Sequence, residues 1–162
     1  MSLLIDFTTL KPRWKVVATS STTSVNIPAG YRTYRITFFG YKPSDRWGVF
    51  KTTRKTGYSY LYGQGMRKGS WFTEEMTRGN NDKEIFIGAA GDANAGYMLV
   101  SMTLARETTS SDIFLAYHDA TFRGSLTYST GRSEFGITSP TTAWTLTTDA
   151  SSGRWIVEAF EE

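Results

Sequence analysis

The residues whose chemical type could support catalysis are few, and they centre on a single histidine. His118 precedes Asp119 and lies six residues after Asp112. A serine hydrolase needs such a base held by a carboxylate, together with a nucleophile on a strained turn beside oxyanion donors. The chain has no Gly-x-Ser-x-Gly sequence. We therefore expect His118 to end a β-strand and to play no catalytic part.

Metal and glycosidase chemistry are no better indicated. One histidine without any cysteine would need several carboxylates to hold zinc. Paired carboxylates could act on a glycosidic bond, but the acidic side chains are of the kind that a β-sandwich places in solvated loops: Glu74, Glu75, Asp82, Glu84, Asp92, Glu161 and Glu162. Asp92 and Asn94 suit an Asx-turn better than a calcium loop. The sequence predicts no enzyme, no metal and no cofactor.

Composition places the chain among single globular domains. Its 162 residues leave little room for a second core, and a hydrophobic content of 40% is enough for one. The absence of cysteine removes disulfides and thiolate nucleophiles. It fits folding in a reducing cytoplasm, although virion and secreted proteins can also lack cysteine. The net charge of +3 is too small to establish nucleic-acid binding.

The N-terminal segment does not have the pattern of a secretion signal. It lacks a basic start, and Asp6 interrupts the apolar run early. No apolar run in the chain has the length of a membrane span. We expect a soluble chain that does not contact a membrane.

The most regular segment of the sequence is the one after a short turn at residues 28–30. Tyr34, Ile36 and Phe38 alternate with polar residues, as in a strand with one buried and one solvated face. The turn itself is Pro-Ala-Gly, in which glycine permits a positive φ. Three later segments repeat the alternation, with these residues on one face: Met98, Val100, Met102 and Leu104; Ile113, Leu115 and Tyr117; and Trp155, Val157 and Ala159.

Many short strands separated by turn signals predict an all-β fold, a single-domain β-sandwich that we expect to be a jelly roll. No segment has the apolar spacing of a long helix. We expect residues 1–12 to form an N-terminal arm or edge strand and residues 13–162 to form the sandwich. The predicted strands are residues 13–19, 24–27, 33–39, 47–53, 57–62, 84–88, 97–105, 112–118, 122–128, 144–148 and 154–160. Residues 63–84 are punctuated by glycine and predict an irregular connection, which is often functional.

A mixed basic and aromatic region lies in the middle of the chain. Its residues that could form a binding surface are Arg54, Tyr58, Tyr60, Tyr62, Arg67, Trp71 and Phe72. Such side chains anchor subunit interfaces, and this interpretation is favoured. Aromatic faces could instead stack on sugar rings, so a host glycan is the second interpretation. Single-stranded nucleic acid comes last, because acidic residues flank the region and the net charge is small.

Several motifs in order along the chain resemble jelly-roll modules in virion proteins of tailed bacteriophages. Residues 27–38 read IPAGYRTYRITF, with a Tyr-x-x-Tyr-x-Ile-x-Phe strand after a small turn, and Lys-Pro-Ser follows at residues 42–44. A Gly-Tyr-x-Tyr segment comes at residues 57–60, and Ser-Gly before a final apolar strand at residues 152–157. Each motif is short, and the likeness spans most of the chain.

The resemblance implies a structural role in the virion, after assembly in the host cytoplasm. With no fibrous stalk or attachment domain visible in the sequence, the chain looks more like a capsid decoration (cement) protein than like a complete tail fibre. The implied partners are the major capsid protein or a tail protein and other copies of the chain, as in a homotrimer; a glycan-binding tail-tip domain is the alternative. We expect the contacts to involve the region above and an apolar arm formed by Leu3, Leu4, Ile5 and Phe7.

Overall fold

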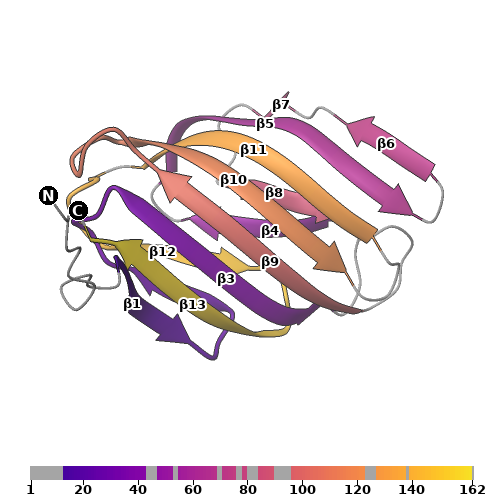
Figure 1. Ribbon diagram of the computed structural model, residues 1–162, viewed down its shortest axis with the longest axis horizontal. Coiled ribbons are helices and arrows are strands. Elements are labelled where there is room, and N and C mark those ends of the chain that lie inside the picture. The colour runs from indigo at the N-terminus through magenta and orange to yellow at the C-terminus, as the bar shows by residue number, and fades with distance from the viewer. Residues whose placement is uncertain are drawn as a thin grey trace, which may run out of the picture.

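Thirteen β-strands and no helix make up the described part of the chain (Figure 1). The computed structural model describes residues 13–42, 47–52, 55–68, 71–75, 78–79, 84–89, 96–122, 127–137 and 139–161, with side chains at 13–41, 96–121, 136–137 and 139–161. The strands are β1 (Trp14–Ser20), β2 (Ser24–Ile27), β3 (Thr33–Lys42), β4 (Trp47–Thr52), β5 (Lys55–Lys68), β6 (Trp71–Glu75), β7 (Arg78–Gly79), β8 (Glu84–Ala89), β9 (Gly96–Ala105), β10 (Ile113–Phe122), β11 (Thr127–Ile137), β12 (Trp144–Thr148) and β13 (Ser152–Phe160).

The strands form two antiparallel sheets. The large sheet has the order β1-β13-β3-β9-β10-β11-β5-β6, with β7 paired to β5. The small sheet has the order β2-β12-β4-β8, and its strands lie behind the large sheet in Figure 1. The all-β sandwich predicted from the sequence is confirmed. A jelly roll is not confirmed, because β9, β10 and β11 follow one another as neighbours within one sheet.

The core lies between the two sheets and is built from alternate residues of their inner faces. Tyr34, Ile36 and Phe38 of β3 are at most 1% exposed, as the alternation predicts. Inner-face residues of the other predicted strands are also fully buried: Met98, Val100, Met102 and Leu104 on β9, and Trp155, Val157 and Ala159 on β13. The small sheet contributes Val25, Ile27, Trp144 and Leu146.

Aromatic contacts connect the two layers. The rings of Phe114 on β10 and Trp144 on β12 lie 5.8 Å apart between centroids. Within the large sheet, Trp155 packs against Phe38 at 4.4 Å, and its indole N–H donates to the carbonyl oxygen of Thr22, in the turn before β2, at 3.1 Å. Buried aromatic rings contribute large apolar areas, so these few residues fix how the sheets lie on each other.

The turn at residues 28–30, before β3, forms as the sequence predicts. Gly30 has a φ of 98°, a left-handed conformation that favours glycine. The hydroxyl of Tyr34 donates to the carbonyl oxygen of Pro28 at 2.8 Å and closes the turn onto the strand. The predicted strands at residues 24–27 and 144–148 have the bounds of β2 and β12.

Two predicted segments are corrected. Residues 63–84 are not irregular throughout, because β5 continues to Lys68 and β6, β7 and the start of β8 follow. The glycines at 63 and 65 are accommodated within β5, which pairs with β11 on one side and β6 on the other. Residues 122–128 are not one strand, since β10 ends at Phe122 and β11 begins at Thr127. Most of β11 was missed because residues 127–137 do not alternate between apolar and polar types along the sequence.

His118 does not end its strand. It lies inside β10, is 0% exposed and faces the core. The strand continues because β9 and β11 supply backbone partners on both sides, from Leu115 to Phe122 with β9 and from Ile113 to Phe122 with β11. The predicted arm at residues 1–12 lies outside the described residues.

Candidate interaction surface

The outer face of the large sheet carries all the exposed large apolar side chains of the described residues. These are Val16, Phe39, Tyr97, Leu99, Ile113, Leu115 and Tyr117, each 43–62% exposed. Cross-strand pairing groups Phe39, Tyr97 and Leu99 at one end of this face and Ile113 and Leu115 at the other. Val16 and Tyr117 lie in one row between these groups, on either side of Glu158, Arg35 and Thr103. An extended apolar surface on a folded protein marks a contact site more often than scattered single residues do.

One end of this face is aromatic. Tyr41 pairs with Tyr97 across β3 and β9, and Phe39 pairs with Leu99 in the next row. The rings of Phe39 and Tyr97 are stacked, 5.4 Å apart with an interplanar angle of 5°, and Tyr41 meets Tyr97 edge-on at 5.3 Å. Arg154 of β13 pairs with Phe39 and is exposed. We refer to these five residues as the aromatic end.

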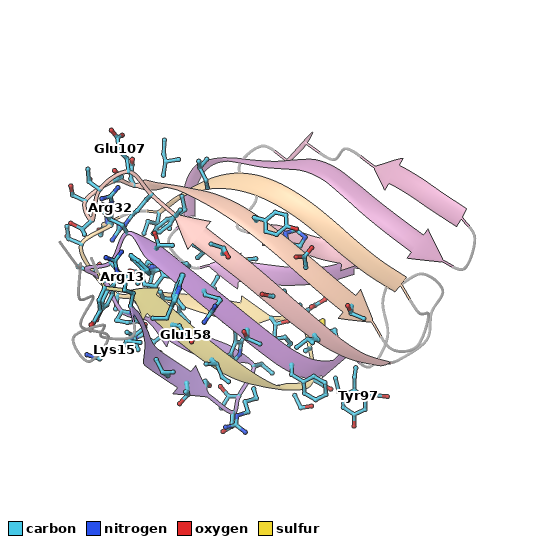
Figure 2. The ribbon with its side chains drawn as sticks, viewed as in Figure 1. Arg13, Lys15, Arg32, Tyr97, Glu107 and Glu158 are labelled. Carbon is cyan, nitrogen blue, oxygen red and sulfur yellow. The ribbon has the colours of Figure 1, made fainter. Side chains whose placement is uncertain are left out.

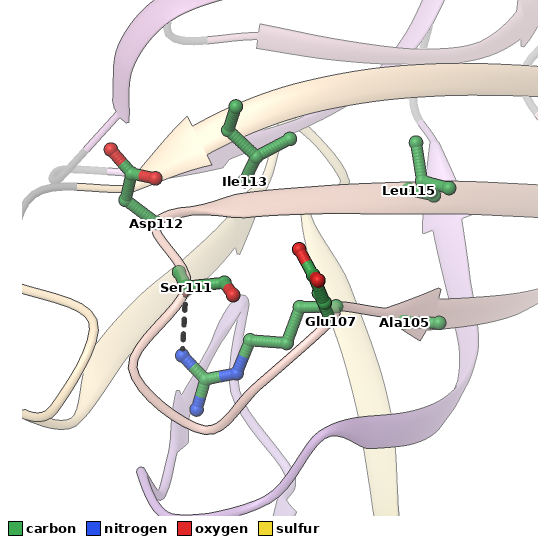
Figure 3. A pocket seen from close by; sticks show the side chains of 7 residues that line it. Ala105, Glu107, Ser111, Asp112, Ile113 and Leu115 are labelled. Atoms are coloured by element: carbon green, nitrogen blue, oxygen red, sulfur yellow. Dashed lines mark hydrogen bonds between the residues drawn. The ribbon is translucent and has the colours of Figure 1, made fainter.

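The opposite end of the face is aliphatic with an acidic rim. A hollow of about 560 Å³ lies where β9 turns into β10 (Figure 3). Ile113 and Leu115 form its apolar wall, and the carboxylates of Glu107 and Asp112 are exposed at its rim. We refer to these four residues as the acidic end. Tyr97 and Glu107 mark the two ends in Figure 2.

Arg106 lies beneath the acidic end and is only 6% exposed. Its Nε donates to the carbonyl oxygen of Tyr31 at 3.0 Å, and its Nη1 donates to those of Ser111 and Pro140 at 3.2 and 3.0 Å; the first Nη1 bond is dashed in Figure 3. The guanidinium lies 4.9 Å from the ring centroid of Phe114. Burial lowers the pKa of Arg106. The side chain thus ties three loops together from inside.

The middle of the outer face is polar. Arg35 of β3 makes a bidentate pair with Glu158 of β13, from Nε to Oε2 at 2.7 Å and from Nη2 to Oε1 at 2.9 Å. The guanidinium also lies 4.7 Å from the ring centroid of Trp14. Tyr117 donates to Oδ1 of Asp119 at 3.0 Å. These bonds orient polar groups between the two apolar ends.

The Arg35–Glu158 pair gives a pH prediction. Hydrogen bonding to Arg35 lowers the pKa of the Glu158 carboxyl. A carboxyl whose pKa is lower in the folded than in the unfolded state stabilises the protein at pH values above the ordinary glutamate pKa of about 4.3. This stabilisation is lost as the pH falls through the folded-state pKa. Because the pair is partly exposed, we expect it to contribute about 0.5–1 kcal/mol. Urea unfolding at fixed protein concentration should therefore show a steeper loss of stability below pH 4.5 in the wild type than in Glu158→Gln.

A matched control uses the looser pair at the end of the same strand. Lys15 and Glu161 are 3.5 Å apart and both well exposed. Glu161→Gln should lose stability below pH 4.5 as steeply as the wild type does. If Glu158→Gln leaves the pH dependence of the unfolding free energy below pH 4.5 unchanged, the bidentate pair does not stabilise the protein.

The site residues predicted from the sequence lie partly within the described chain. Leu3, Leu4, Ile5, Phe7 and Arg54 lie outside it. Tyr58, Tyr60, Tyr62 and Arg67 belong to β5, and Trp71 and Phe72 to β6, at the far edge of the large sheet. The β5–β6 pairing brings Arg67 opposite Phe72 and Lys68 opposite Trp71.

Backbone register connects part of this region to the exposed face. Leu115 pairs with Glu134, which pairs with Tyr60. Tyr117 pairs with Arg132, which pairs with Tyr62. Tyr60 and Tyr62 therefore occupy the same cross-strand rows as two exposed apolar residues, two strands away.

The exposed apolar residues on β3 and β9 were missed as contact candidates, and Ile113, Leu115 and Tyr117 were recognised only as sharing a face. That face is the solvent-exposed one, and the buried residues of β10 are Phe114, Ala116, His118 and Ala120. A signal for the outer face exists in the sequence: residues 97–100 and 113–117 are continuously apolar. A strand with one solvated face should alternate between apolar and polar residues instead. Continuous apolar runs therefore indicate strands that are buried on both faces.

Within the described residues there is no helix long and apolar enough to cross a membrane, and no cluster of three or more potential metal ligands. No known protein family, curated protein or solved structure matches the chain.

Proposed function

We propose that the protein is a non-enzymatic structural protein of a tailed-phage virion, a capsid decoration protein that acts through protein–protein contacts. The observation that carries this proposal is the outer face of the large sheet, on which seven large apolar side chains are about half exposed around a polar middle. Stable protein interfaces are built around such aromatic and aliphatic groups with a polar rim. The sequence motifs that resemble phage jelly-roll modules support the virion assignment.

The position of the only histidine supports a non-catalytic role. A general base must come within hydrogen-bond reach of its substrate. His118 is 0% exposed on the inner face of β10, so a substrate at the surface does not reach its ring. The aspartate next to it, Asp119, lies on the opposite face and accepts a hydrogen bond from Tyr117.

The proposal is tested by binding to virus particles. Purified protein should co-sediment with capsids of the phage that encodes it, and immunogold labelling should place it on the head. If residues 1–10 form the arm that the sequence predicts, deleting them should abolish this binding while leaving the unfolding midpoint unchanged. Failure to bind heads or tails at micromolar concentration would contradict the virion assignment. Normal binding of the truncated protein would exclude the arm as a contact.

The second candidate is a glycan-binding tail-tip domain, and the aromatic end favours it. The rings of Phe39 and Tyr97 are exposed and have hydroxyl and guanidinium groups beside them, a combination that can stack on a sugar. A glycan array should then show sugar-specific binding that Tyr97→Ala abolishes. Trp71→Ala and Tyr60→Ala test the region predicted from the sequence. Binding of no glycan would remove this candidate.

A further inference from the structure

The two ends of the outer face lie on one strand and have opposite character. Tyr97 and Ala105 begin and end the exposed part of β9, about 27 Å apart at ~3.4 Å per residue. Tyr97 belongs to the aromatic end, and Ala105 pairs with Leu115 of the acidic end. Both ends therefore belong to the same continuous sheet surface.

Their charges are opposite as well. Arg154 is the charged residue of the aromatic end, and Glu107 and Asp112 are those of the acidic end. The exposed Arg32, whose carbonyl oxygen accepts from the backbone N–H of Arg106, lies beside the acidic end and offsets part of its negative charge.

Between the two ends, the β9 residues on this face are Ser101 and Thr103, which are small. Their cross-strand neighbours include Arg35 and the exposed Tyr117, so the centre of the face is polar with one ring. A surface with unlike ends is complementary to itself when one copy is turned end over end.

We propose that the outer face of the large sheet binds a second copy of this chain. The two-fold axis crosses β9 between Ser101 and Thr103, so that each aromatic end covers the acidic end of the other copy. The twisted sheets would lie face to face with their strands roughly aligned, as sheets in sandwiches do. This inference rests on the proposed function only in taking the outer face as a protein-contact surface.

The available area suits a dimer. Seven side chains, each exposing about half of the ~150–250 Å² of a large side chain, offer on the order of 700 Å² per copy. A standard interface buries about 800 Å² per partner. The polar groups around the centre bring the total to that range.

Geometry favours two copies over three. Because both ends lie on the same face, one inverted copy can engage both at once. Once the first contact has formed, the second is intramolecular and strengthens the complex. The same patch then serves both copies, which is an isologous interface of the kind found in most two-fold dimers. In the trimer implied by the sequence resemblance, each copy would contact two neighbours through different ends, so no single partner would engage both ends at once.

Light scattering coupled to gel filtration tests the proposal on the full chain. The wild type should have twice the monomer mass of 18.2 kDa at about 10 µM. Leu115→Asp places a carboxylate in the contact and should raise the dissociation constant at least tenfold. Leu115 is 62% exposed, so the thermal unfolding of the monomer should not change. Asn26→Asp, at an exposed position of β2 in the small sheet, is the matched control and should remain dimeric.

A charge exchange tests the orientation. Arg154→Glu places acidic groups opposite Glu107 and Asp112 and should weaken the dimer about tenfold at low salt. Adding Glu107→Lys and Asp112→Lys to Arg154→Glu should bring the dissociation constant back to within about threefold of the wild type. If the triple variant is as weak as Arg154→Glu, the end-over-end orientation is wrong.

Other results overturn the proposal outright. A wild-type monomer at 100 µM, a trimer, or a dimer unaffected by Leu115→Asp each excludes a two-fold contact through this face. A monomer that binds capsids through Leu115, or a glycan through Tyr97, assigns the face to that other occupant. A dimer that does not bind particles would leave this inference standing and contradict the virion role.

Discussion

Replacing Arg106 with methionine is expected to lower the free energy of unfolding by about 3 kcal/mol, measured by urea titration. Methionine keeps much of the apolar stem but removes the donors to the carbonyl oxygens of Tyr31, Ser111 and Pro140. A buried acceptor that loses its partner costs about 1–3 kcal/mol. Water can replace part of this, because the three acceptor residues are only half-buried. The expected loss of unfolding free energy is therefore smaller than the summed cost of leaving three buried carbonyl oxygens without a partner.

Two further variants separate charge from geometry at this position. Arg106→Lys keeps the positive charge, but an ammonium cannot reproduce a planar fork that reaches three carbonyls and stacks on Phe114. We expect it to lose about 2 kcal/mol. Lys15→Met removes an exposed cation and its 3.5 Å contact with Glu161, and should cost less than about 0.5 kcal/mol. An Arg106→Met protein within 0.5 kcal/mol of the wild type would show that the guanidinium does not hold the loops.

The fold could be predicted where burial on one side of a strand imposes alternation. On β3, β9 and β13 the inner residues are apolar and the strand bounds follow to within a few residues. β5 and β11 were misread for a physical reason. Their residues include Gly63, Gly65 and Gly131, which weaken a strand considered alone, whereas in the sheet each strand receives hydrogen bonds from neighbours on both sides. Pairing between distant segments cannot be read from local pattern.

The contact surface that the sequence predicts at residues 54–72 stays a prediction, because the side chains of this region lie outside those that the structure describes. Aromatic side chains next to basic ones indicate contact surfaces, and the sequence directed attention to residues 54–72. The exposed rings that the structure describes are Phe39 on β3, Tyr97 on β9 and Tyr117 on β10. Phe38 and Phe39 show why the local sequence does not locate such rings: they are adjacent and chemically alike, yet Phe38 is 0% exposed and Phe39 is 51% exposed. Only the sheet order determines which of two apolar faces meets the small sheet.

Substituting either of two paired glycines should test how closely β3 and β13 pack around the ring of Phe38. Gly40 of β3 pairs with Gly153 of β13, and the ring of Phe38 lies over both. A Cβ at Gly153 would overlap that ring, and a Cβ at Gly40 would also lie 2.5 Å from the backbone oxygen of Ser152. Overpacking a core costs about 1–3 kcal/mol and occasionally more. We expect about 2 kcal/mol for Gly153→Ala and about 3 kcal/mol or more for Gly40→Ala, from urea unfolding.

Combining each substitution with Phe38→Leu distinguishes a side-chain clash from a backbone clash. At Gly153 every close neighbour is an atom of the Phe38 ring, so a smaller residue 38 should recover most of the loss, and the double variant should be more stable than the sum of the single effects predicts. At Gly40 the carbonyl of Ser152 remains in place, and recovery should be smaller. Ser152→Ala, at an exposed position of the same strand, is the control and should change stability by less than about 0.5 kcal/mol. Equal recovery at both glycines would mean that the backbone of β13 can move away from β3, and that the ring of Phe38 rather than strand pairing sets the spacing of the two strands.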